Sequence, residues 1–269
     1  MREAETPYIT LRNGRHRFTA PEVMGILNAT PDSFFAASRK ETEADMARRA
    51  DEIIAEGGAI IDVGACSTRP GSESVAAEEE MSRMRKALST VRRLHPDAIV
   101  SVDTFRPEVA KMSVEEYGAD IINDVSGGSE EMFRLAARLQ AVYLLMSSDP
   151  TAEAVSRMFD TKIAELNSLG CDNIILDPGY GFGKDTAQNY SVMMHQRALR
   201  RSHYPLLAGV SRKRMVWQLL GCTPEEALNG TTAVNAVALM QGADILRVHD
   251  VRQAKETIKI IKACSCISE

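Results

Sequence analysis

Short apolar runs that each end in a polar side chain recur along this chain, and longer amphipathic stretches separate them. The most informative run is Ile174-Ile175-Leu176, which leads into Asp177, and Pro178 then prevents further sheet pairing. Four other runs have the same form. We interpret each run as a buried strand that delivers a polar group to its C-terminal end. The other runs end at Asn28, Asp62, Asp103 and Asn123-Asp124.

Eight strands and their connecting helices account for most of the 269 residues. Eight such units, in a chain near the typical length of about 250 residues, predict a single (β/α)8 TIM barrel of the α/β class. The alternative is an open doubly wound sheet, which should carry a glycine-rich turn after its first strand, and none follows Asn28. The predicted strands cover residues 23–28, 59–62, 99–103, 121–123, 142–146, 174–177, 205–210 and 245–248. The predicted helices cover residues 41–56, 76–94, 132–140, 155–169 and 232–241, and two more begin near residues 107 and 253.

An N-terminal segment precedes the first barrel strand. Asn13-Gly14 separates two short extended runs, and this dipeptide is a strong signal for a β-hairpin. We expect one domain overall. Residues 1–22 should form a short hairpin that closes the base of the barrel, and residues 23–269 should form the barrel itself.

The composition excludes several kinds of partner. A net charge of -5 and a pI near 5.7 leave no basic stripe for nucleic acid. No apolar run approaches the roughly 20 residues of a membrane span, and the first residues lack the apolar core of a signal peptide, so we expect no membrane partner and a cytoplasmic protein. Five scattered cysteines predict reduced thiols, although Cys264-Ser265-Cys266 can also be read as a metal or redox pair.

Acceptor side chains should meet at one end of such a barrel, because the C-terminal ends of the strands form the active site in this fold. Asp103, Asn123 and Asp177 are short acceptor-rich side chains at three different strand ends. They suit the N–H and amino edge of a planar heterocycle. The sequence therefore predicts an acidic pocket for a ring.

Cations should line the same end. Lys213 follows the seventh strand, and Arg247 and His249 point the same way from the eighth, where positive charges suit a phosphate. Arg69, after the second strand, can donate paired hydrogen bonds to an anion. Asn28 offers a hard oxygen to a Mg²⁺ bound by diphosphate. The predicted site thus has acidic side chains that suit a ring and cationic side chains that suit a phosphate group.

Other polar residues have simpler explanations. Asp32 and Asp62 can equally well cap turns. Lys184 and Arg214 are expected to be solvated, and Trp217 lies in a helical pattern typical of core. The glycine-rich turn before Lys184 has G-x-G-x-G spacing, which matches neither the Walker nor the dinucleotide-binding pattern. Four histidines lack partners at ligand spacing and are expected to be surface or core polar groups: His16, His95, His195 and His203.

Seven blocks carry a family resemblance, and in chain order they are Met24-Gly-Ile-Leu-Asn-Ala-Thr-Pro-Asp-Ser-Phe34, Ser67-Thr-Arg-Pro-Gly71, Ser101-Val-Asp-Thr104, Ile122-Asn-Asp-Val125, Asp177-Pro-Gly-Tyr-Gly-Phe-Gly-Lys184, Gly209-Val-Ser-Arg-Lys213 and Arg247-Val-His249. Together they resemble the signature of the dihydropteroate synthase family. The resemblance implies a TIM-barrel transferase. Such an enzyme joins 6-hydroxymethyl-7,8-dihydropterin diphosphate to 4-aminobenzoate and releases diphosphate in folate biosynthesis.

The resemblance also implies a role for each candidate residue and a homodimer as the usual assembly. Mg²⁺ is the implied cofactor, with Asn28 as its protein ligand, and no covalent nucleophile is required. Catalysis is implied for Asp103, Asp177, Lys213 and Arg247. Pterin binding is implied for Asp103, Asn123, Asp177 and Lys213, diphosphate binding for Asn28, Arg69, Arg247 and His249, and 4-aminobenzoate binding for Thr68, Arg69, Pro70 and Phe182.

Three segments depart from the family pattern. Residues 146–150 replace the usual Met-His-Met-Gln-Gly, Arg214 stands where serine is common, and the loop 35–39 lacks Ser-Asp-Gly-Gly. Two other functions stay open. One is a pterin-binding domain of a corrinoid-dependent methyltransferase, which has no need of the cations Arg69, Arg247 and His249. The other is a catalytically silent pterin-binding paralogue, favoured only by the altered fifth-strand segment.

Overall fold

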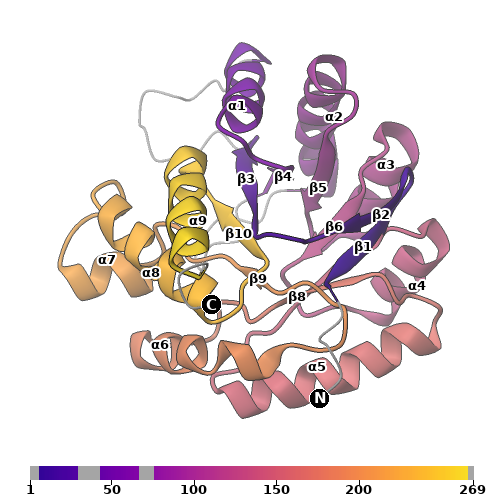
Figure 1. Cartoon of the computed structure of the whole chain (residues 1–269). Helices are drawn as coiled ribbons and strands as arrows, with labels where there is room; N and C mark the ends of the chain where they lie inside the picture. The colour runs from indigo at the N-terminus through magenta and orange to yellow at the C-terminus, as the bar shows by residue number, and fades with distance from the viewer. Residues whose placement is uncertain (1–5, 30–42, 67–75, 266–269) are drawn as a thin grey trace.

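Eight parallel strands form the centre of the computed structural model, which describes residues 6–29, 43–66 and 76–265. The strand order in the sheet is β8-β7-β6-β5-β4-β3-β10-β9, and a bridge between Leu176 and Leu206 links its two edges. The sheet therefore curls into a nearly closed barrel with the helices outside (Figure 1). The predicted TIM barrel is confirmed, and the open doubly wound sheet is wrong.

The observed elements follow the predicted ones closely except between residues 186 and 220. The strands are β3 (Glu22–Asn28), β4 (Ile60–Gly64), β5 (Ile99–Asp103), β6 (Ile121–Asp124), β7 (Val142–Met146), β8 (Ile174–Asp177), β9 (Leu207–Ala208) and β10 (Ile245–Val248). The helices are α1 (Glu43–Ala55), α2 (Ala77–Leu94), α3 (Pro107–Tyr117), α4 (Glu130–Leu139), α5 (Ala152–Ser168), α6 (Thr186–Met194), the 3₁₀ turn η1 (Gln196–Leu199), α7 (Arg214–Leu220), α8 (Leu228–Met240) and α9 (Val251–Ser265).

Two differences from the predicted elements have local causes. The strand β9 is shorter than the predicted 205–210: it begins at Leu207, shortly after Pro205, which has no N–H to give to a sheet ladder, and it ends at Ala208. No helix is predicted at α6, although the sequence carries a signal for one. Asp185 and Gln188 form a capping box there, in which each side chain bonds the backbone of the other residue.

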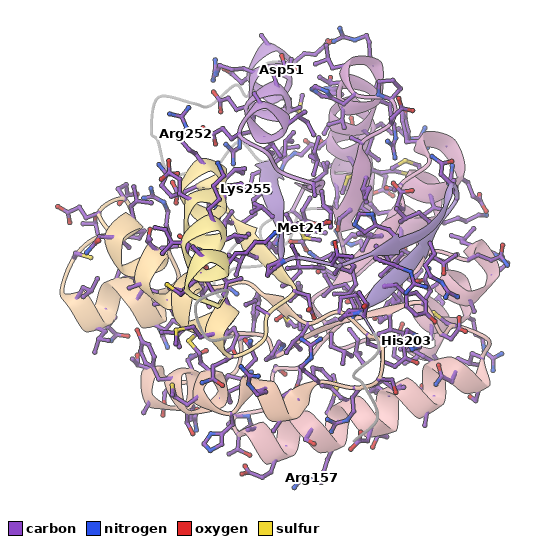
Figure 2. The ribbon with its side chains drawn as sticks, viewed as in Figure 1. Met24, Asp51, Arg157, His203, Arg252 and Lys255 are labelled. Atoms are coloured by element: carbon purple, nitrogen blue, oxygen red, sulfur yellow. The ribbon has the colours of Figure 1, made fainter. Side chains whose placement is uncertain are left out.

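Side chains of the strands alternate between the two faces of the barrel wall. In β4, Ile61 and Val63 face outward and join the core between strands and helices, whereas Ile60 faces the interior. Met24 also lies inside the ring, while Asp51 and Arg157 lie on outer helices (Figure 2). The interior is apolar where the strands begin, so polar groups are confined to the other end.

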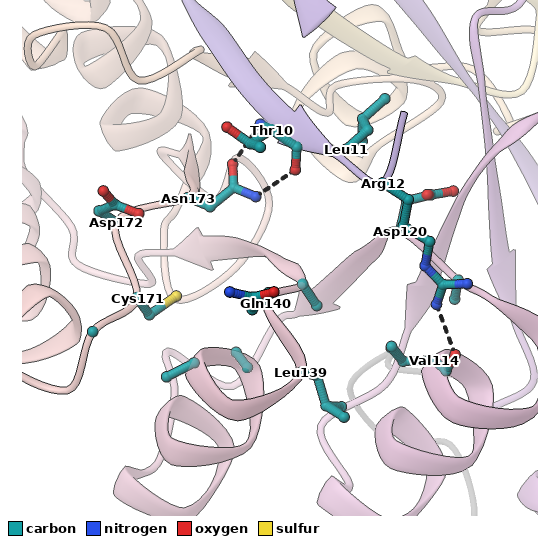
Figure 3. A pocket seen from close by; sticks show the side chains of 15 residues that line it. Thr10, Leu11, Arg12, Val114, Asp120, Leu139, Gln140, Cys171, Asp172 and Asn173 are labelled. Carbon is teal, nitrogen blue, oxygen red and sulfur yellow. Dashed lines mark hydrogen bonds between the residues drawn. The ribbon is translucent and has the colours of Figure 1, made fainter. Parts of the chain in front are cut away.

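The N-terminal hairpin consists of β1 (Tyr8–Leu11) and β2 (Gly14–Arg17), which pair antiparallel as predicted. Ile9 is fully buried and joins the apolar cluster inside the barrel. Asn173, just before β8, binds the backbone of Thr10 twice, through its side-chain oxygen at 2.9 Å and its nitrogen at 2.7 Å (Figure 3). The hairpin is thereby fastened to the end of the barrel where the strands begin.

A cavity of about 500 Å³ lies at this same end, under the hairpin (Figure 3). Its walls include Arg12 of the hairpin and Asp120, Ala141 and Asn173, which directly precede β6, β7 and β8. The cavity is therefore separated by the length of the barrel from the polar strand ends.

Within the described residues, no helix is long and apolar enough to cross a membrane. The described cysteines form no disulfide with one another. In the same part of the chain, no cluster of three or more histidine, cysteine or acidic residues has the arrangement of a metal site. Cys266, one half of the pair considered above, lies outside the described residues, so that reading stays a hypothesis.

Candidate active site

Polar side chains gather inside the barrel where the strands end. Asp103 from β5, Asn123 from β6 and Asp177 from β8 are each less than 8% exposed, although all three are polar. Paired strand positions explain this arrangement, because Asp103 lies beside Asn123 in the ladder and both occupy inward-facing positions. The structure thus brings together the acceptors that the sequence placed at separate strand ends.

Arg247 reaches into this acidic group from β10. Its Nε donates to Asp62 Oδ2 at 2.7 Å, and its Nη2 donates to Asp103 Oδ2 at 2.5 Å. Burial opposes the charge of Arg247, but Asp62 and then Asp103 outweigh it and hold the pKa above its ordinary value. Arg247 therefore stays protonated and links the two carboxylates.

The interpretation of Asp62 as a turn cap is wrong. Its fully buried carboxylate accepts hydrogen bonds from Ser101 Oγ at 2.6 Å and from Asn123 Nδ2 at 3.2 Å, in addition to the pair with Arg247. The sequence held a signal, since apolar Val63 follows Asp62, and in the structure β4 continues through Gly64. A carboxylate within a strand cannot cap a turn, and here it orients two candidate site residues.

Replacing Asp62 with asparagine should lower the free energy of unfolding by about 1–3 kcal/mol, because it weakens the charged hydrogen bond to Arg247 in a buried setting. Urea denaturation measures this change. The matched control is Asp51→Asn, which alters an exposed carboxylate bonded to His95. We expect that control to shift stability by no more than about 0.5 kcal/mol. Equal shifts in the two variants would contradict the central role of Asp62.

Asp103 has one carboxylate oxygen to spare. Oδ2 accepts from Arg247, whereas Oδ1 is buried and has no hydrogen-bond partner among the described residues. Burial is the main cause that raises the pKa of Asp103 to about 7, with Arg247 acting in the opposite direction. A buried acceptor without a partner is unfavourable, so Oδ1 is suited to an N–H donor of a ligand.

Asp177 and Lys213 form the other side of the site. Asp177 Oδ1 accepts the backbone N–H of Gly179 at 2.7 Å, and burial raises its pKa against the opposing charge of Lys213. Lys213 donates to the carbonyl of Tyr180, and its Nζ lies 4.6 Å from the centre of the Phe182 ring. Burial lowers the pKa of Lys213 to about 8. An ammonium group, a carboxylate and an aromatic ring therefore share one wall.

His249 and Ser211 fix each other at the rim. The backbone N–H of His249 donates to Ser211 Oγ at 3.1 Å, and the same hydroxyl lies 3.1 Å from His249 Nδ1. Burial and then Arg247 lower the pKa of His249 to about 4, so the ring is neutral near pH 7. Since the hydroxyl already accepts one N–H, its own proton is available to Nδ1. A hydroxyl that donates to Nδ1 would leave the ring proton on Nε2, as a neutral donor.

Asn28 ends β3 beside Gly64 and Asp103. A Cβ at Gly64 would lie 3.6 Å from Asn28 Oδ1 and 4.0 Å from Asp103 Oδ2, so both oxygens border this position on the rim. An amide oxygen is a hard ligand of the kind that Mg²⁺ accepts. Asn28 therefore fits a metal ion that is held largely by a diphosphate.

Several predicted positions cannot be placed. Thr68, Arg69 and Pro70 fall in 67–75, and Asp32 and the loop 35–39 fall in 30–42, all outside the described residues. Their roles remain predictions.

The prediction that Lys184 is solvated is wrong. Its side chain is buried, and its ammonium group donates to backbone carbonyls of Ser147 and Gly179. Arg214 is exposed as expected, and Trp217 is partly buried against the core. A long lysine side chain gives no local signal of burial, because only the fold brings the carbonyls around it.

The segment 146–150, which departs from the family pattern, is well defined. Met146 is buried inside the barrel, beside Asp177 in the ladder. The Ser147 hydroxyl donates to Asp149 Oδ2 at 2.7 Å and accepts the backbone N–H of Asp149 at 3.2 Å, which closes a compact turn. The altered residues therefore build an ordered wall beside Asp177.

Comparisons with known proteins agree with this geometry. Residues 24–249 match the family described as pterin binding enzyme. The chain is 37% identical over 259 residues to a dihydropteroate synthase from Escherichia coli (strain K12), covering 90% of this chain and 91% of that one. It is 37% identical over 251 residues to a dihydropteroate synthase from Bacillus subtilis (strain 168), covering 90% and 87%.

Solved structures give the same result. A dihydropteroate synthase of Xanthomonas albilineans with 4-aminobenzoic acid superposes with a TM-score of 0.89 at 32% identity, covering 97% of this chain and 98% of that one. A Yersinia pestis dihydropteroate synthase in a sulfonamide drug complex gives a TM-score of 0.89 at 33% identity, covering 96% and 99%.

Proposed function

We infer the roles of individual residues from the premise that this chain belongs to the pterin-binding enzyme family, as one of its dihydropteroate synthases. It is a transferase that joins 6-hydroxymethyl-7,8-dihydropterin diphosphate to 4-aminobenzoate and releases diphosphate in folate biosynthesis. The observation that supports our assignment of roles is the contact of Arg247 with Asp103. It places a cation suited to an anion and a carboxylate suited to a ring at the same end of the barrel.

The pterin ring is assigned to the acidic side of the site. The spare oxygen of Asp103, the amide of Asn123 and the carboxylate of Asp177 would bond its amino and N–H groups. The ammonium group of Lys213 would bond a ring acceptor. The burial of these groups supports the assignment, because their hydrogen bonds are stronger away from water.

The diphosphate is assigned to Arg247, His249 and Asn28, with Arg69 as a further candidate outside the described residues. The neutral His249 would donate from Nε2, and Arg247 would supply the positive charge. Asn28 would help to hold Mg²⁺. When bound, Mg²⁺ neutralises part of the negative charge of the diphosphate.

The proposed reaction is a substitution in which the bond between the pterin methylene and the diphosphate oxygen breaks as the diphosphate departs. The carboxylates of Asp103 and Asp177 stabilise the positive charge that develops on the methylene carbon. The amine nitrogen of 4-aminobenzoate then bonds to that carbon and transfers a proton to water. Phe182 would contact the aminobenzoate ring, together with Thr68, Arg69 and Pro70.

The direct test is diphosphate release measured with each substrate alone and with both together. We expect release to require both substrates. The corrinoid-dependent methyltransferase alternative predicts no diphosphate release. The silent paralogue predicts pterin binding without turnover.

The pH dependence of kcat/KM should reflect the shifted pKa values of Asp103 and Lys213. Asp103, with a pKa of about 7, gains a proton as the pH falls and then no longer stabilises a cation. Lys213, with a pKa of about 8, loses its proton as the pH rises and no longer donates three hydrogen bonds. We therefore expect kcat/KM for the pterin substrate to be greatest between these values and to fall on both sides. Lys213→Arg should move the alkaline fall to higher pH, and an unchanged alkaline limb would contradict the assignment to Lys213.

We also propose a homodimer formed through the face made by α7 and α8. Large apolar side chains are exposed there, including Leu219 at 63%, Leu220 at 55% and Met240 at 62%. Apolar surface of this kind on neighbouring helices is typical of a protein interface. Sedimentation should give twice the 29.5 kDa chain mass, and Leu220→Glu should give the monomer mass. A monomer at high concentration of the unaltered protein would exclude the dimer.

The cytoplasmic location stays a prediction.

A further inference from the structure

Lys184 is a buried cation whose bonded partners are backbone carbonyls. Its side chain is 6% exposed, and Nζ donates to Ser147 O at 3.0 Å, Gly179 O at 3.1 Å and Phe182 O at 3.3 Å. Ser147 directly follows β7, whereas the other two carbonyls belong to the turn after β8. The ammonium group therefore joins the ends of two neighbouring strands.

The glycines of this turn show how closely the two segments approach. Gly179 and Gly183 have φ angles of +68° and +61°, which disfavour other residues. A Cβ on Gly179 would collide with the carbonyl oxygen of Ser147, and one on Gly183 would collide with that of Ser148. The turn thus lies directly on the backbone of the segment after β7, and Lys184 bonds across this contact.

A second ammonium group holds the same turn from the other side. Lys213 donates to the carbonyl of Tyr180 and faces the ring of Phe182. Three carbonyls of one turn, those of Gly179, Tyr180 and Phe182, are therefore fixed by two lysines from different parts of the chain. Lys184 bonds the carbonyl of Phe182 and Lys213 faces its ring, so both lysines contact this residue.

We propose that Lys184 is a positioning residue for the 4-aminobenzoate half of the site. It holds the turn 179–183 against the end of β7 and so places the ring of Phe182, which rests on the proposed role of Phe182 in binding aminobenzoate. The bonds of Lys184 go to neutral carbonyls in one compact contact, and its charge is not needed to pair with a carboxylate. Its role is therefore to order the main chain.

Burial lowers the pKa of Lys184 to about 8, while Asp177 and Asp149 act in the opposite direction. The ammonium group is accordingly retained near pH 7. Its hydrogen atoms are then available to all three carbonyls at once.

Two substitutions separate positioning from folding. Lys184→Met keeps the length of the side chain but removes its donors, and Lys184→Gln keeps two donors without the charge. In Lys184→Met we expect KM for 4-aminobenzoate to rise about tenfold, which corresponds to a loss of about 1.4 kcal/mol of binding when the Phe182 ring is no longer held in place. KM for the pterin substrate and kcat should change much less, because Asp177 and Lys213 hydrogen-bond this turn at Gly179 and Tyr180 and not at Phe182. Lys184→Gln should recover part of the loss, and the exposed Lys111→Met is the matched control with no expected change.

Amide hydrogen exchange gives a readout that does not depend on the function. The amides of residues 179–183 should exchange faster in Lys184→Met than in the unaltered protein, and those of α3 should not. If both KM values rise equally, or if exchange of the turn is unchanged, the proposal is overturned. Should Lys184→Met fail to fold, Lys184→Gln carries the same measurements.

Phe182→Ala distinguishes this proposal from the proposed function. An unchanged KM for 4-aminobenzoate in Phe182→Ala would show that the pocket is assigned wrongly. Hydrogen exchange would still decide whether Lys184 holds the turn. If KM for 4-aminobenzoate rises in Phe182→Ala but not in Lys184→Met, the assignment of Phe182 to the aminobenzoate pocket stands and the proposed role of Lys184 is overturned.

Discussion

Replacing Arg247 with alanine is expected to remove nearly all activity and to weaken the fold. The activity falls because the leaving diphosphate loses its main cation, and removal of one such group costs about 10²–10³ in kcat. The fold weakens because Asp62 and Asp103 remain buried without their partner. Breaking a buried ion pair by removing one member costs about 3–5 kcal/mol.

Steady-state kinetics and urea denaturation measure the two effects separately. Arg252→Ala is the matched control, because Arg252 is exposed and pairs with Glu56 on the surface at 3.5 Å. We expect that control to change stability by less than about 1 kcal/mol. Adding Asp62→Asn to Arg247→Ala should recover part of the lost stability, since one uncompensated carboxylate is removed. Strict additivity of the two changes would contradict the coupling.

Replacing Asp177 with asparagine should have a different signature, with a large loss of activity and little change in stability. The asparagine oxygen can still accept the N–H of Gly179, so the local turn is retained. The negative charge that stabilises the developing cation is lost. We expect kcat/KM to fall by about 10²–10³, as when a preorganised electrostatic group is removed from an active site.

Stability should stay nearly constant in Asp177→Asn because two effects oppose each other. Burial of the charged carboxylate is unfavourable, as the raised pKa of Asp177 shows, and asparagine removes that penalty. Lys213 loses a favourable neighbour at the same time. Thermal denaturation and diphosphate release check the two halves of the prediction. Activity close to that of the unaltered enzyme would exclude Asp177 from catalysis.

The two variants together test whether the pterin-binding and the diphosphate-binding residues act in one site at the same end of the barrel. Arg247 touches Asp103 directly, and its charge also acts on Asp177. If the halves are coupled as the structure indicates, each variant should lower the rate of diphosphate release even at saturating concentrations of both substrates. A change confined to KM would instead indicate that the residue contributes only to binding.

Most strand and helix positions could be predicted from the sequence, because they depend on local patterns. Apolar runs such as 174–177 and 99–103 match β8 and β5 to the residue. Helices with weak apolar periodicity, such as α6, were missed although a capping box marks the start. Asp103, Asn123 and Asp177 were found because each ends an apolar run, and such an ionised or polar group needs a partner.

The buried contacts of Asp62 and Lys184 could not be predicted from local patterns. The bond between Arg247 and Asp62 joins residues 185 positions apart, and Lys184 reaches Ser147 across 37 positions. Neither separation leaves a periodic signal in the chain. A lysine among glycines indicates a solvated loop when it is considered alone, and only the packing of the turn on residues 147–148 buries it.

The sequence by itself determined the alternation of strands and helices, the residues that end each strand and the family to which those blocks belong. Side-chain direction along a strand repeats every two residues, so it can be predicted without knowing the neighbouring strands. Closure of the barrel decided which of those residues meet, because it brings β10 beside β3 and places Arg247 within reach of β4 and β5. The charge pairs, the pKa shifts and the anchoring of the turn 179–183 follow from that closure.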